Sequence, residues 1–171
     1  MNEGNSTKHE LGRALQLLMD TSPISGITVG DICSACGMNR KSFYYHFRDK
    51  YDLLCWIFYT DYFQELRSHA DEDPLVLLLS FLEEHQKFYR AALRDTDINS
   101  FSACLRDTLL PIASRFLSLS VLSSEDAAFY SDMCTEALHH CIVRWLQEGC
   151  PQPAAHLGRL LQRIPSVLNH D

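Results

Sequence analysis

The sequence contains no run of about eighteen apolar residues, the length that a membrane-spanning helix needs, and no signal-peptide pattern at its start. It also has no strand-like alternation of apolar and polar residues, no internal repeat and no low-complexity segment. These absences argue against a membrane protein, a secreted protein and a β-sheet. We therefore expect an all-α protein that resides in the cytoplasm.

Sequence motifs that carry catalysis are missing as well. There is no glycine-rich phosphate loop, no nucleophile motif and no HExxH sequence. Paired acids such as Glu83 and Glu84 are neighbours in the chain, so their side chains diverge on a helix and form a solvated face. We therefore predict that the protein is not an enzyme and carries no cofactor.

The seven cysteines are an odd number scattered through helix-like segments, which favours reduced thiols over a disulfide framework. Cys33 and Cys36 have the CxxC spacing of zinc and redox sites. Both fall on the inward face of a short predicted helix, however, where a small buried hydrophobic side chain is the favoured interpretation. A second group of possible metal ligands comprises Cys134, His139, His140 and Cys141. Because His140 is offset from the face that the two cysteines share, we predict no metal site.

The net charge of −7 gives no overall excess of positive charge, but its distribution is uneven. Residues 1–55 contain six basic and six acidic side chains, whereas residues 56–171 contain nine basic and sixteen acidic ones. Within residues 38–50 there are four basic side chains and one acid, Asp49. The local excess of positive charge indicates where an anionic partner such as nucleic acid is expected to bind.

Residues 27–54 show the pattern of two short helices joined by a tight turn. Thr28 and Asp31 suit the N-cap and N3 positions of the first helix. Gly37 follows where a turn needs a positive φ, and Asn39 can cap the second helix, which we expect from Arg40 to Phe47. The apolar face of the first helix comes from Val29, Ile32, Cys33 and Cys36, and Met38 is an apolar plug in the turn. The pattern predicts a helix-turn-helix.

The second of these helices has an inward and an outward face. Phe43 and Phe47 lie four residues apart and point inward, which leaves cations, hydroxyl groups and two tyrosines facing outward. Such a face is typical of a helix that lies in the major groove of DNA. We predict that Arg40, Lys41 and Tyr45 reach base edges, and that Lys50 and Tyr44 hold phosphates with help from Thr28, Ser42 and His46. The full predicted DNA-binding set is Thr28, Asn39, Arg40, Lys41, Ser42, Tyr44, Tyr45, His46 and Lys50.

The same segment resembles the DNA-binding signature of TetR-type (TetR/AcrR) transcriptional regulators. The matching residues are Thr28, Asp31, Ile32, Gly37, Met38, Phe43, Tyr44, His46, Phe47, Lys50, Leu53 and Leu54. Lys41 departs from the family, in which this position is commonly a small residue. The resemblance implies a helix-turn-helix domain over residues 1–55 and a helical effector-binding and dimerisation domain over residues 56–171. It also implies a homodimer that binds double-stranded operator DNA of palindromic sequence.

Further helices are expected on both sides of this motif. Thr7 and Glu10 form a capping-box pair that predicts the start of the first helix. Asp49 can cap a long helix over residues 50–70, and the sequence at 71–74 breaks it before a helix that runs from Leu75 to Tyr89.

The second half of the chain predicts a loop over residues 94–100 and a helix over 101–119 with a bend at Pro111. Ser123 can cap a long helix that ends at Gln147, and Pro153 opens a final helix.

The long helix has apolar residues on more than one face: Ala137, Leu138, Cys141, Ile142, Val143, Trp145 and Leu146. A helix that is apolar on several sides is buried on several sides. We predict that the last two helices pair with a second copy, the alternative being a fully buried helix in a monomer.

Aromatic residues are concentrated in the middle of the chain. They form either a filled core or the wall of a mostly apolar pocket for a small-molecule effector, and TetR-type regulators keep such a pocket in this region. The residues that we select for it are Tyr59, Tyr62, Phe88, Phe101, Arg106 and His139. The second half also resembles the branch that contains dihydroxyacetone-kinase regulators, through residues 88–90, 99–101 and 145–149.

Taken together, these patterns predict a transcriptional regulator that binds DNA as a homodimer and responds to a small molecule. A ligand in the C-terminal domain would change the spacing of the two recognition helices by shifting a conformational equilibrium. The alternative is a co-regulator with the same fold whose C-terminal domain binds a protein partner. A C-terminal core filled by side chains would favour that alternative.

Overall fold

The computed structural model describes residues 3–94, 101–116 and 124–163, and all regular structure within these ranges is helical. The N-terminal elements are α1 (Glu3–Met19), the 3-10 turn η1 (Ile24–Gly26), α2 (Val29–Ala35), α3 (Arg40–His46) and α4 (Lys50–Ser68). They are followed by α5 (Pro74–Glu84), α6 (Gln86–Ala92), α7 (Phe101–Phe116), α8 (Ser124–Gln147) and α9 (Ala154–Gln162). The predicted all-α fold is confirmed.

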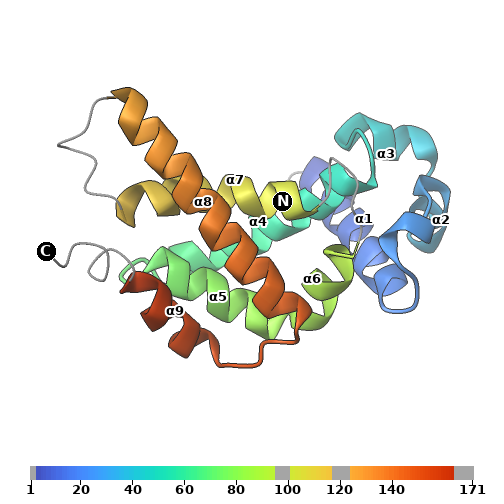
Figure 1. Ribbon diagram of the computed structural model, residues 1–171. Coiled ribbons are helices and arrows are strands. Elements are labelled where there is room, and N and C mark those ends of the chain that lie inside the picture. Colours follow the sequence, from blue (N-terminus) through green and yellow to red (C-terminus); the bar gives the residue numbers. More distant parts are fainter. Residues whose placement is uncertain (1–2, 95–100, 117–123, 164–171) are drawn as a thin grey trace, which may run out of the picture.

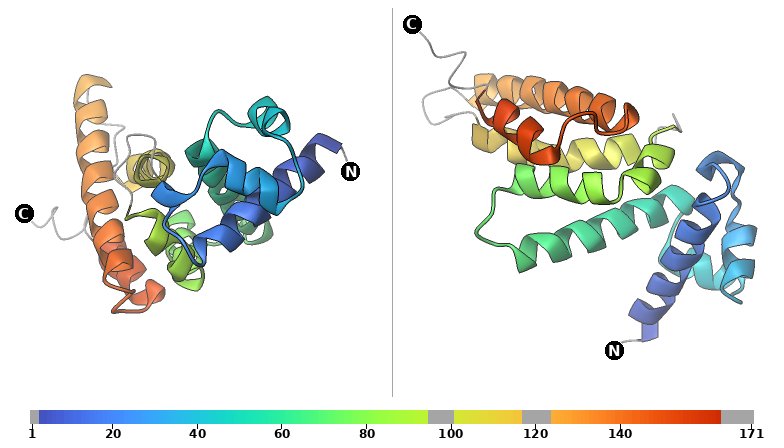
Figure 2. Two further views of the ribbon diagram at one scale, coloured as in Figure 1. Left: turned by 90° about the vertical axis from the view of Figure 1, so that its right-hand side faces the viewer. Right: turned by 90° about the horizontal axis from the view of Figure 1, so that it is seen from below.

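The helices form a small unit at one end and a layered bundle beside it (Figure 1). The small unit contains α1, α2 and α3, and α4 leads from it into the bundle. Figure 2 shows α4 beneath α5 and α7, with α8 and α9 on the outer side of the bundle. The closest helix pairs are α7 with α8 and α5 with α9, while α1 packs against α2, α4 and α6. Because α4 continues through position 55, the predicted domain boundary lies within one unbroken helix.

Two predicted helix ends differ from the structure. Helix α1 already begins at Glu3, so Thr7 and Glu10 lie inside it and the predicted start at Thr7 is wrong. Extending a formed helix costs little, because each added residue gains one backbone hydrogen bond. The predicted helix from Leu75 to Tyr89 is also wrong, since the chain turns at His85 and forms two helices. No glycine or proline stands at His85, and a polar run such as residues 83–87 is also usual on the solvent face of an unbroken helix, so the pattern did not mark this break.

Other predicted helix ends are present. The Asp49 carboxylate accepts hydrogen bonds from the backbone N–H groups of Tyr51 and Asp52, both at 2.8 Å, and so caps α4. Pro111 lies inside α7, and Pro153 precedes α9 as expected. Residues 95–100 of the loop predicted at 94–100, and the cap predicted at Ser123, lie outside the described residues.

A cluster of aromatic rings fills the centre of the bundle. The Phe58 ring stacks on Tyr62 at 5.7 Å between centroids and meets the Phe101 ring edge-on at 5.1 Å. Tyr89 stacks on Phe101 at 4.8 Å, and each of these four rings is at most 2% exposed. The Tyr62 hydroxyl donates a hydrogen bond of 2.9 Å to the Pro74 carbonyl, and burial raises the pKa values of Tyr62 and Tyr89. Tyr62 and Phe101 therefore belong to a packed core. For these two rings the structure agrees with a filled core rather than with the wall of a pocket.

Candidate nucleic-acid interface

The start of α2 is held by the capping box that the sequence predicts. The Thr28 hydroxyl accepts a hydrogen bond from the Asp31 N–H at 3.1 Å, and the Asp31 carboxylate accepts one from the Thr28 N–H at 2.8 Å. The same carboxylate accepts a bond of 2.7 Å from the Thr28 hydroxyl. These bonds from Thr28 lower the pKa of Asp31. Both polar side chains are thus committed to the end of the helix.

The turn between α2 and α3 depends on Gly37, whose φ of 68° lies in the left-handed region that glycine adopts without steric cost. The Met38 N–H then donates to the Cys33 carbonyl at 2.9 Å, which closes the turn. The Asn39 side chain accepts hydrogen bonds from the Ser42 N–H at 2.9 Å and from the Ser42 hydroxyl at 3.3 Å, so it caps α3 as predicted.

The inward faces of the two helices agree with the predicted pattern. Phe43 and Phe47 are 0% and 4% exposed, and they seat α3 on the core of the small unit. Cys33 is buried in the same core, and the Cys36 thiol donates to the Ile32 carbonyl at 3.3 Å. No group of three or more potential metal ligands occurs among the described residues. The structure thus gives both cysteines a packing role.

The outward face of α3 carries large exposed side chains. Tyr45 is 84% exposed and Tyr44 is 58% exposed, and the Lys41 side chain is also exposed. The half-buried His46 ring meets the Tyr45 ring edge-on, with 4.9 Å between the centroids. Exposed side chains that lie next to one another form a patch, and such patches often mark interaction sites. This face is the strongest candidate for contact with a partner.

Arg40 lies back across the first turn of α2. A Cβ atom built on Gly30 would come within 2.6 Å of the Arg40 Nη2 atom, so only glycine leaves room for the guanidinium in this position. Arg40 is nevertheless exposed, and its charge contributes to the low pKa of Asp31. The sequence placed Arg40 on the outward face but gave no indication of its contact with α2.

Lys50 makes contacts in the structure that the sequence did not indicate. Its ammonium group donates to three backbone carbonyls in and beside η1: Ile24 at 2.6 Å, Ser25 at 3.1 Å and Ile27 at 2.9 Å. An ammonium group has three N–H donors, and all three are used here. These bonds join the start of α4 to the turn that precedes α2, and the phosphate contact at Lys50 stays a prediction.

Arg48 is a cation that the predicted set omitted. Its side chain is 86% exposed, and the guanidinium lies 3.5 Å from the Asp52 carboxylate. An exposed pair of this kind is worth little, so the guanidinium can turn to another anion. Arg48 is one of the four basic residues in the segment 38–50, and this local excess of positive charge was the signal in the sequence.

The side chains predicted to bind a small molecule do not share one environment. Tyr62 and Phe101 are in the aromatic core, whereas Phe88 is half-buried on α6. Tyr59 is half-buried on α4, and burial raises the pKa of its hydroxyl. The remaining two join α7 to α8: Arg106 pairs with Asp132 and Glu136, and His139 contacts Ser102. Burial lowers the pKa of His139.

Two known families match this chain. Residues 14–55 match the family described as bacterial regulatory proteins, tetR family. Residues 72–165, more than half of the chain, match the family described as transcriptional regulator C-terminal region. The helix-turn-helix, the helical second half and these two matches define the class as transcriptional regulators. The chain belongs to the TetR family, which confirms the resemblance seen in the sequence.

Individual relatives agree with this assignment. The HTH-type dhaKLM operon transcriptional activator DhaS of Lactococcus lactis subsp. lactis is 32% identical over 88 residues, which cover 49% of this chain and 47% of that protein. The match thus spans about half the length of the relative.

Two solved structures share the fold. The dihydroxyacetone kinase operon activator DhaS has a TM-score of 0.66 at 20% identity, with 95% of each chain covered. The fatty acid degradation regulator FadR from Bacillus halodurans has a TM-score of 0.61 at 17% identity, with 96% of this chain and 97% of that chain covered. Among the helices described here, none is long and apolar enough to cross a membrane.

The role of Lys50 can be tested by replacing it with methionine, which keeps the length of the side chain and removes its donors. We expect Lys50→Met to lower the free energy of unfolding by about 1.5–3 kcal/mol, the range for hydrogen bonds to a charged group. Urea unfolding measures this change, and Lys41→Met on the exposed face of α3 is the matched control. Unchanged stability together with weaker DNA binding would instead support the phosphate contact.

Proposed function

We propose that this regulator binds a palindromic operator in double-stranded DNA as a homodimer in the cytoplasm, and that it responds to a small-molecule effector. The observation that carries the DNA-binding part is the outward face of α3, with its exposed tyrosines and cations. A recognition helix of this kind contacts base edges with side chains near its start, while its neighbours position it on the backbone.

The contacts divide into three groups in this proposal. Lys41, Tyr45 and Arg40 reach base edges. Arg40 does so after its guanidinium moves away from Gly30. Tyr44 and His46 contact phosphates, and Arg48 supplies the cation in place of Lys50. Thr28, Asn39 and Ser42 face the DNA from the helix ends, where their side chains already hold α2 and α3 in position.

Selection from a random pool of DNA duplexes tests this proposal and provides an operator for further work. We expect a palindrome whose half-sites are about 34 Å, or one helical turn, apart or a multiple of it. Lys41→Ala is expected to relax the preference at one base pair per half-site, with a loss of about 1–3 kcal/mol. Arg48→Ala is expected to weaken binding to all sequences and to reduce the salt slope by about 0.9 per half-site.

Arg67→Ala, an exposed arginine in the last turn of α4, is the control for both variants because it lies at the opposite end of α4 from the helix-turn-helix. Failure to enrich any sequence would contradict the proposal. Equal effects of the control and the α3 variants would contradict the placement of the DNA.

The outer side of α8 supports the homodimer. Phe129 is 66% exposed and Met133 is 52% exposed, and the exposed Ala137 continues the same face at a spacing of four residues. Leu160 on α9 is 48% exposed, and both helices lie on the side of the bundle away from α3 (Figure 2). A second copy that covers this stripe would remove its apolar surface from water.

Buried residues of α8 and α9 do not test the dimer. Ile142 is 0% exposed and Leu161 is 6% exposed, so both belong to the core of their own protomer. A charge at either position would disrupt the fold whether or not a dimer forms, because it would be buried without a partner. These two residues are therefore unsuitable for a test based on the exposed stripe of α8.

We expect Met133→Asp to give a folded monomer and Ile142→Asp to give an unfolded or strongly destabilised chain. Light scattering measures the mass of each variant, and circular dichroism measures its helix content. A monomeric wild-type chain at micromolar concentration would contradict the homodimer, and an unchanged dimer in Met133→Asp would contradict its placement on the exposed stripe of α8.

A second candidate function follows from the aromatic core. Phe58, Tyr62, Tyr89 and Phe101 fill the space in which an effector pocket was expected. This favours the alternative in which the C-terminal half binds a protein partner. The two candidates differ in the size of the molecule that changes operator affinity.

Fractionation of a cell extract through a membrane that retains proteins separates these candidates. If the protein-free filtrate changes operator affinity, the effector is a small molecule. If only the retained fraction does so, and heating or protease treatment abolishes the effect, a protein partner carries the signal. Operator binding by the purified regulator, titrated by fluorescence anisotropy, is the measurement.

A further inference from the structure

Two cysteines, Cys55 on α4 and Cys104 on α7, meet where these helices pack together. Both are free thiols, and the Cys104 thiol donates a hydrogen bond to the Cys55 sulfur. Cys55 lies in the second turn of α4 and is half-buried, whereas Cys104 is 4% exposed. The Phe58 ring meets the Phe101 ring at 5.1 Å between centroids, so the two helices are in close contact at this point. The thiols are therefore held together in a packed interface, with one of them open to small molecules from solvent.

The surroundings make the two thiols unequal. The hydrogen bond from Cys104 holds the pKa of Cys55 below its usual range, while the contact with Cys55 and burial raise the pKa of Cys104. The Thr108 hydroxyl donates to the Cys104 carbonyl at 3.0 Å, and the Tyr59 hydroxyl contacts the Cys104 sulfur. Cys55 is thus the thiol that ionises first, and a thiolate is the form of cysteine that reacts with peroxides.

Three other cysteines are less suited to this chemistry. Burial raises the pKa of Cys33, Cys134 and Cys150, which keeps each of these thiols protonated and slow to react. Cys55 combines an accessible sulfur with a second thiol in contact, the arrangement in which one cysteine attacks an oxidant and its neighbour completes a disulfide.

We propose that Cys55 and Cys104 are a redox site, in which a peroxide converts the two thiols into a disulfide that joins α4 to α7. With hydrogen peroxide, the Cys55 thiolate attacks one oxygen, the O–O bond breaks, and the departing hydroxide takes a proton to form water. Cys55 is then a sulfenic acid. The Cys104 sulfur attacks the Cys55 sulfur, the S–O bond breaks, and the hydroxyl leaves with the Cys104 proton as a second water. The two sulfurs lose two electrons in total, and the peroxide gains them.

The position of this disulfide gives it a regulatory effect, which rests on the proposed DNA-binding function. Leu54 is buried in the core, and the Trp56 ring contacts the Phe47 ring at 5.7 Å, so this part of α4 belongs to the helix-turn-helix. Helix α7 packs against α8, which carries the exposed stripe of the proposed dimer. A disulfide bond of about 2.05 Å is shorter than any contact between two thiols, so it constrains the separation of α4 and α7. It therefore favours one arrangement of the recognition helices.

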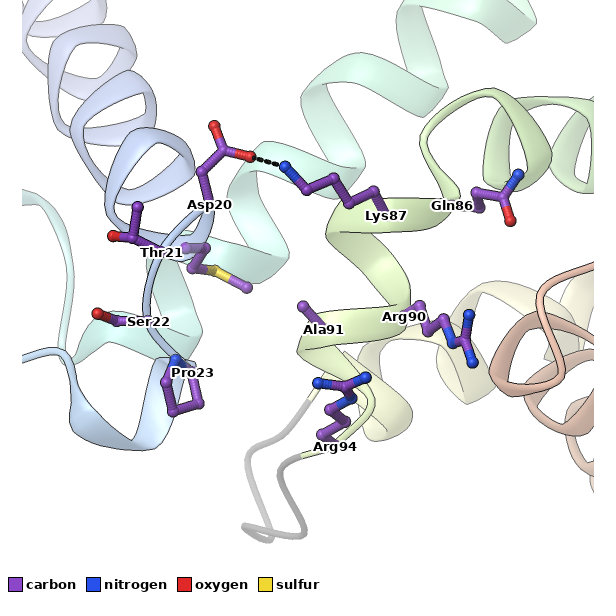
Figure 3. Close-up of a pocket in the computed structure, with 10 residues that line it drawn as sticks. Asp20, Thr21, Ser22, Pro23, Gln86, Lys87, Arg90, Ala91 and Arg94 are labelled. Carbon is purple, nitrogen blue, oxygen red and sulfur yellow. Dashed lines mark hydrogen bonds and ion pairs between the residues drawn. The ribbon is translucent and has the colours of Figure 1, made fainter.

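The contact of α1 with α6 also joins the small unit to the bundle. Figure 3 shows the basic cleft between them, which Arg90 and Arg94 help to line, and the Lys87 ammonium pairs there with the Asp20 carboxylate at 2.7 Å. The two paired side chains are 80% and 57% exposed, and water screens such a pair. This ion pair therefore opposes a displacement of the small unit only weakly.

The disulfide is tested on the full chain, reduced with dithiothreitol, freed of reductant and then treated with equimolar hydrogen peroxide. Remaining thiols are blocked with N-ethylmaleimide before digestion with trypsin. The tryptic peptides 51–67 and 95–106 contain one cysteine each, so mass spectrometry identifies their cross-link without ambiguity. We expect this cross-link in a chain that migrates as a monomer on a non-reducing gel. A disulfide only between other cysteines, a bond between two chains, or oxidation of Cys55 without the cross-link overturns the proposal.

Substitutions separate the two roles. We expect Cys55→Ser to abolish the reaction, and Cys104→Ser to stop it at a Cys55 sulfenic acid that dimedone traps. Cys134→Ser, the same change at a half-buried cysteine of α8, is the control and is expected to form the cross-link as the wild-type chain does. Circular dichroism of the reduced variants checks that each is folded. If Cys104→Ser does not fold, Cys55→Ser and the control still decide, and equal loss of reaction in both overturns the site.

The regulatory effect is measured on the selected operator with reduced and oxidised protein. We expect oxidation to change wild-type operator affinity at least about fivefold, dithiothreitol to reverse the change, and Cys55→Ser to show none. A disulfide without any effect on operator affinity would overturn the regulatory role. A chain that forms the disulfide but selects no DNA refutes the proposed function alone, whereas normal DNA binding without the disulfide refutes the redox site alone.

Discussion

The Lys50 ammonium group is the contact on which the position of the helix-turn-helix depends. It holds three carbonyls of the segment that precedes α2, while its own backbone begins α4 directly after the Asp49 cap. The two ends of the motif are thus joined at one point. The Ile24 carbonyl also accepts from the Ile27 N–H at 3.1 Å, so the ammonium reinforces the backbone hydrogen bond of η1. The recognition helix α3 lies between the two joined ends and inherits its orientation from them.

Helix α4 carries this fixed geometry into the rest of the molecule. Its first turn belongs to the helix-turn-helix, and eight residues later Phe58 lies at the centre of the aromatic core. A close-packed core transmits displacement because its side chains have little free volume. In the proposed response, a change in the bundle would reach α3 through the start of α4, and also through the contact of α1 with α6. The Lys87–Asp20 pair is part of that second connection.

Much of the helix-turn-helix was predictable because its determinants are local. The caps at Thr28 and Asn39 bond backbone N–H groups three residues away, and the turn at Gly37 is closed by a hydrogen bond between residues five apart. Their roles therefore follow from spacing in the sequence. The break at His85 and the earlier start of α1 were not predictable in this way. No glycine or proline marks the break at His85, and the start of α1 depends on how far an exposed helix extends.

The sequence by itself determined the fold class, the motif, the inward phenylalanines of α3 and the family. Each depends on periodicity or on neighbours in the chain. Only the tertiary structure decided that Lys50 binds carbonyls 23 to 26 residues away, that the aromatic residues form a filled core, and that Ile142 is internal while Met133 is exposed. It also brought α1 and α6 together around a basic cleft. These features arise from contacts between segments distant in the chain, and a single sequence does not record which of its many possible long-range contacts are made.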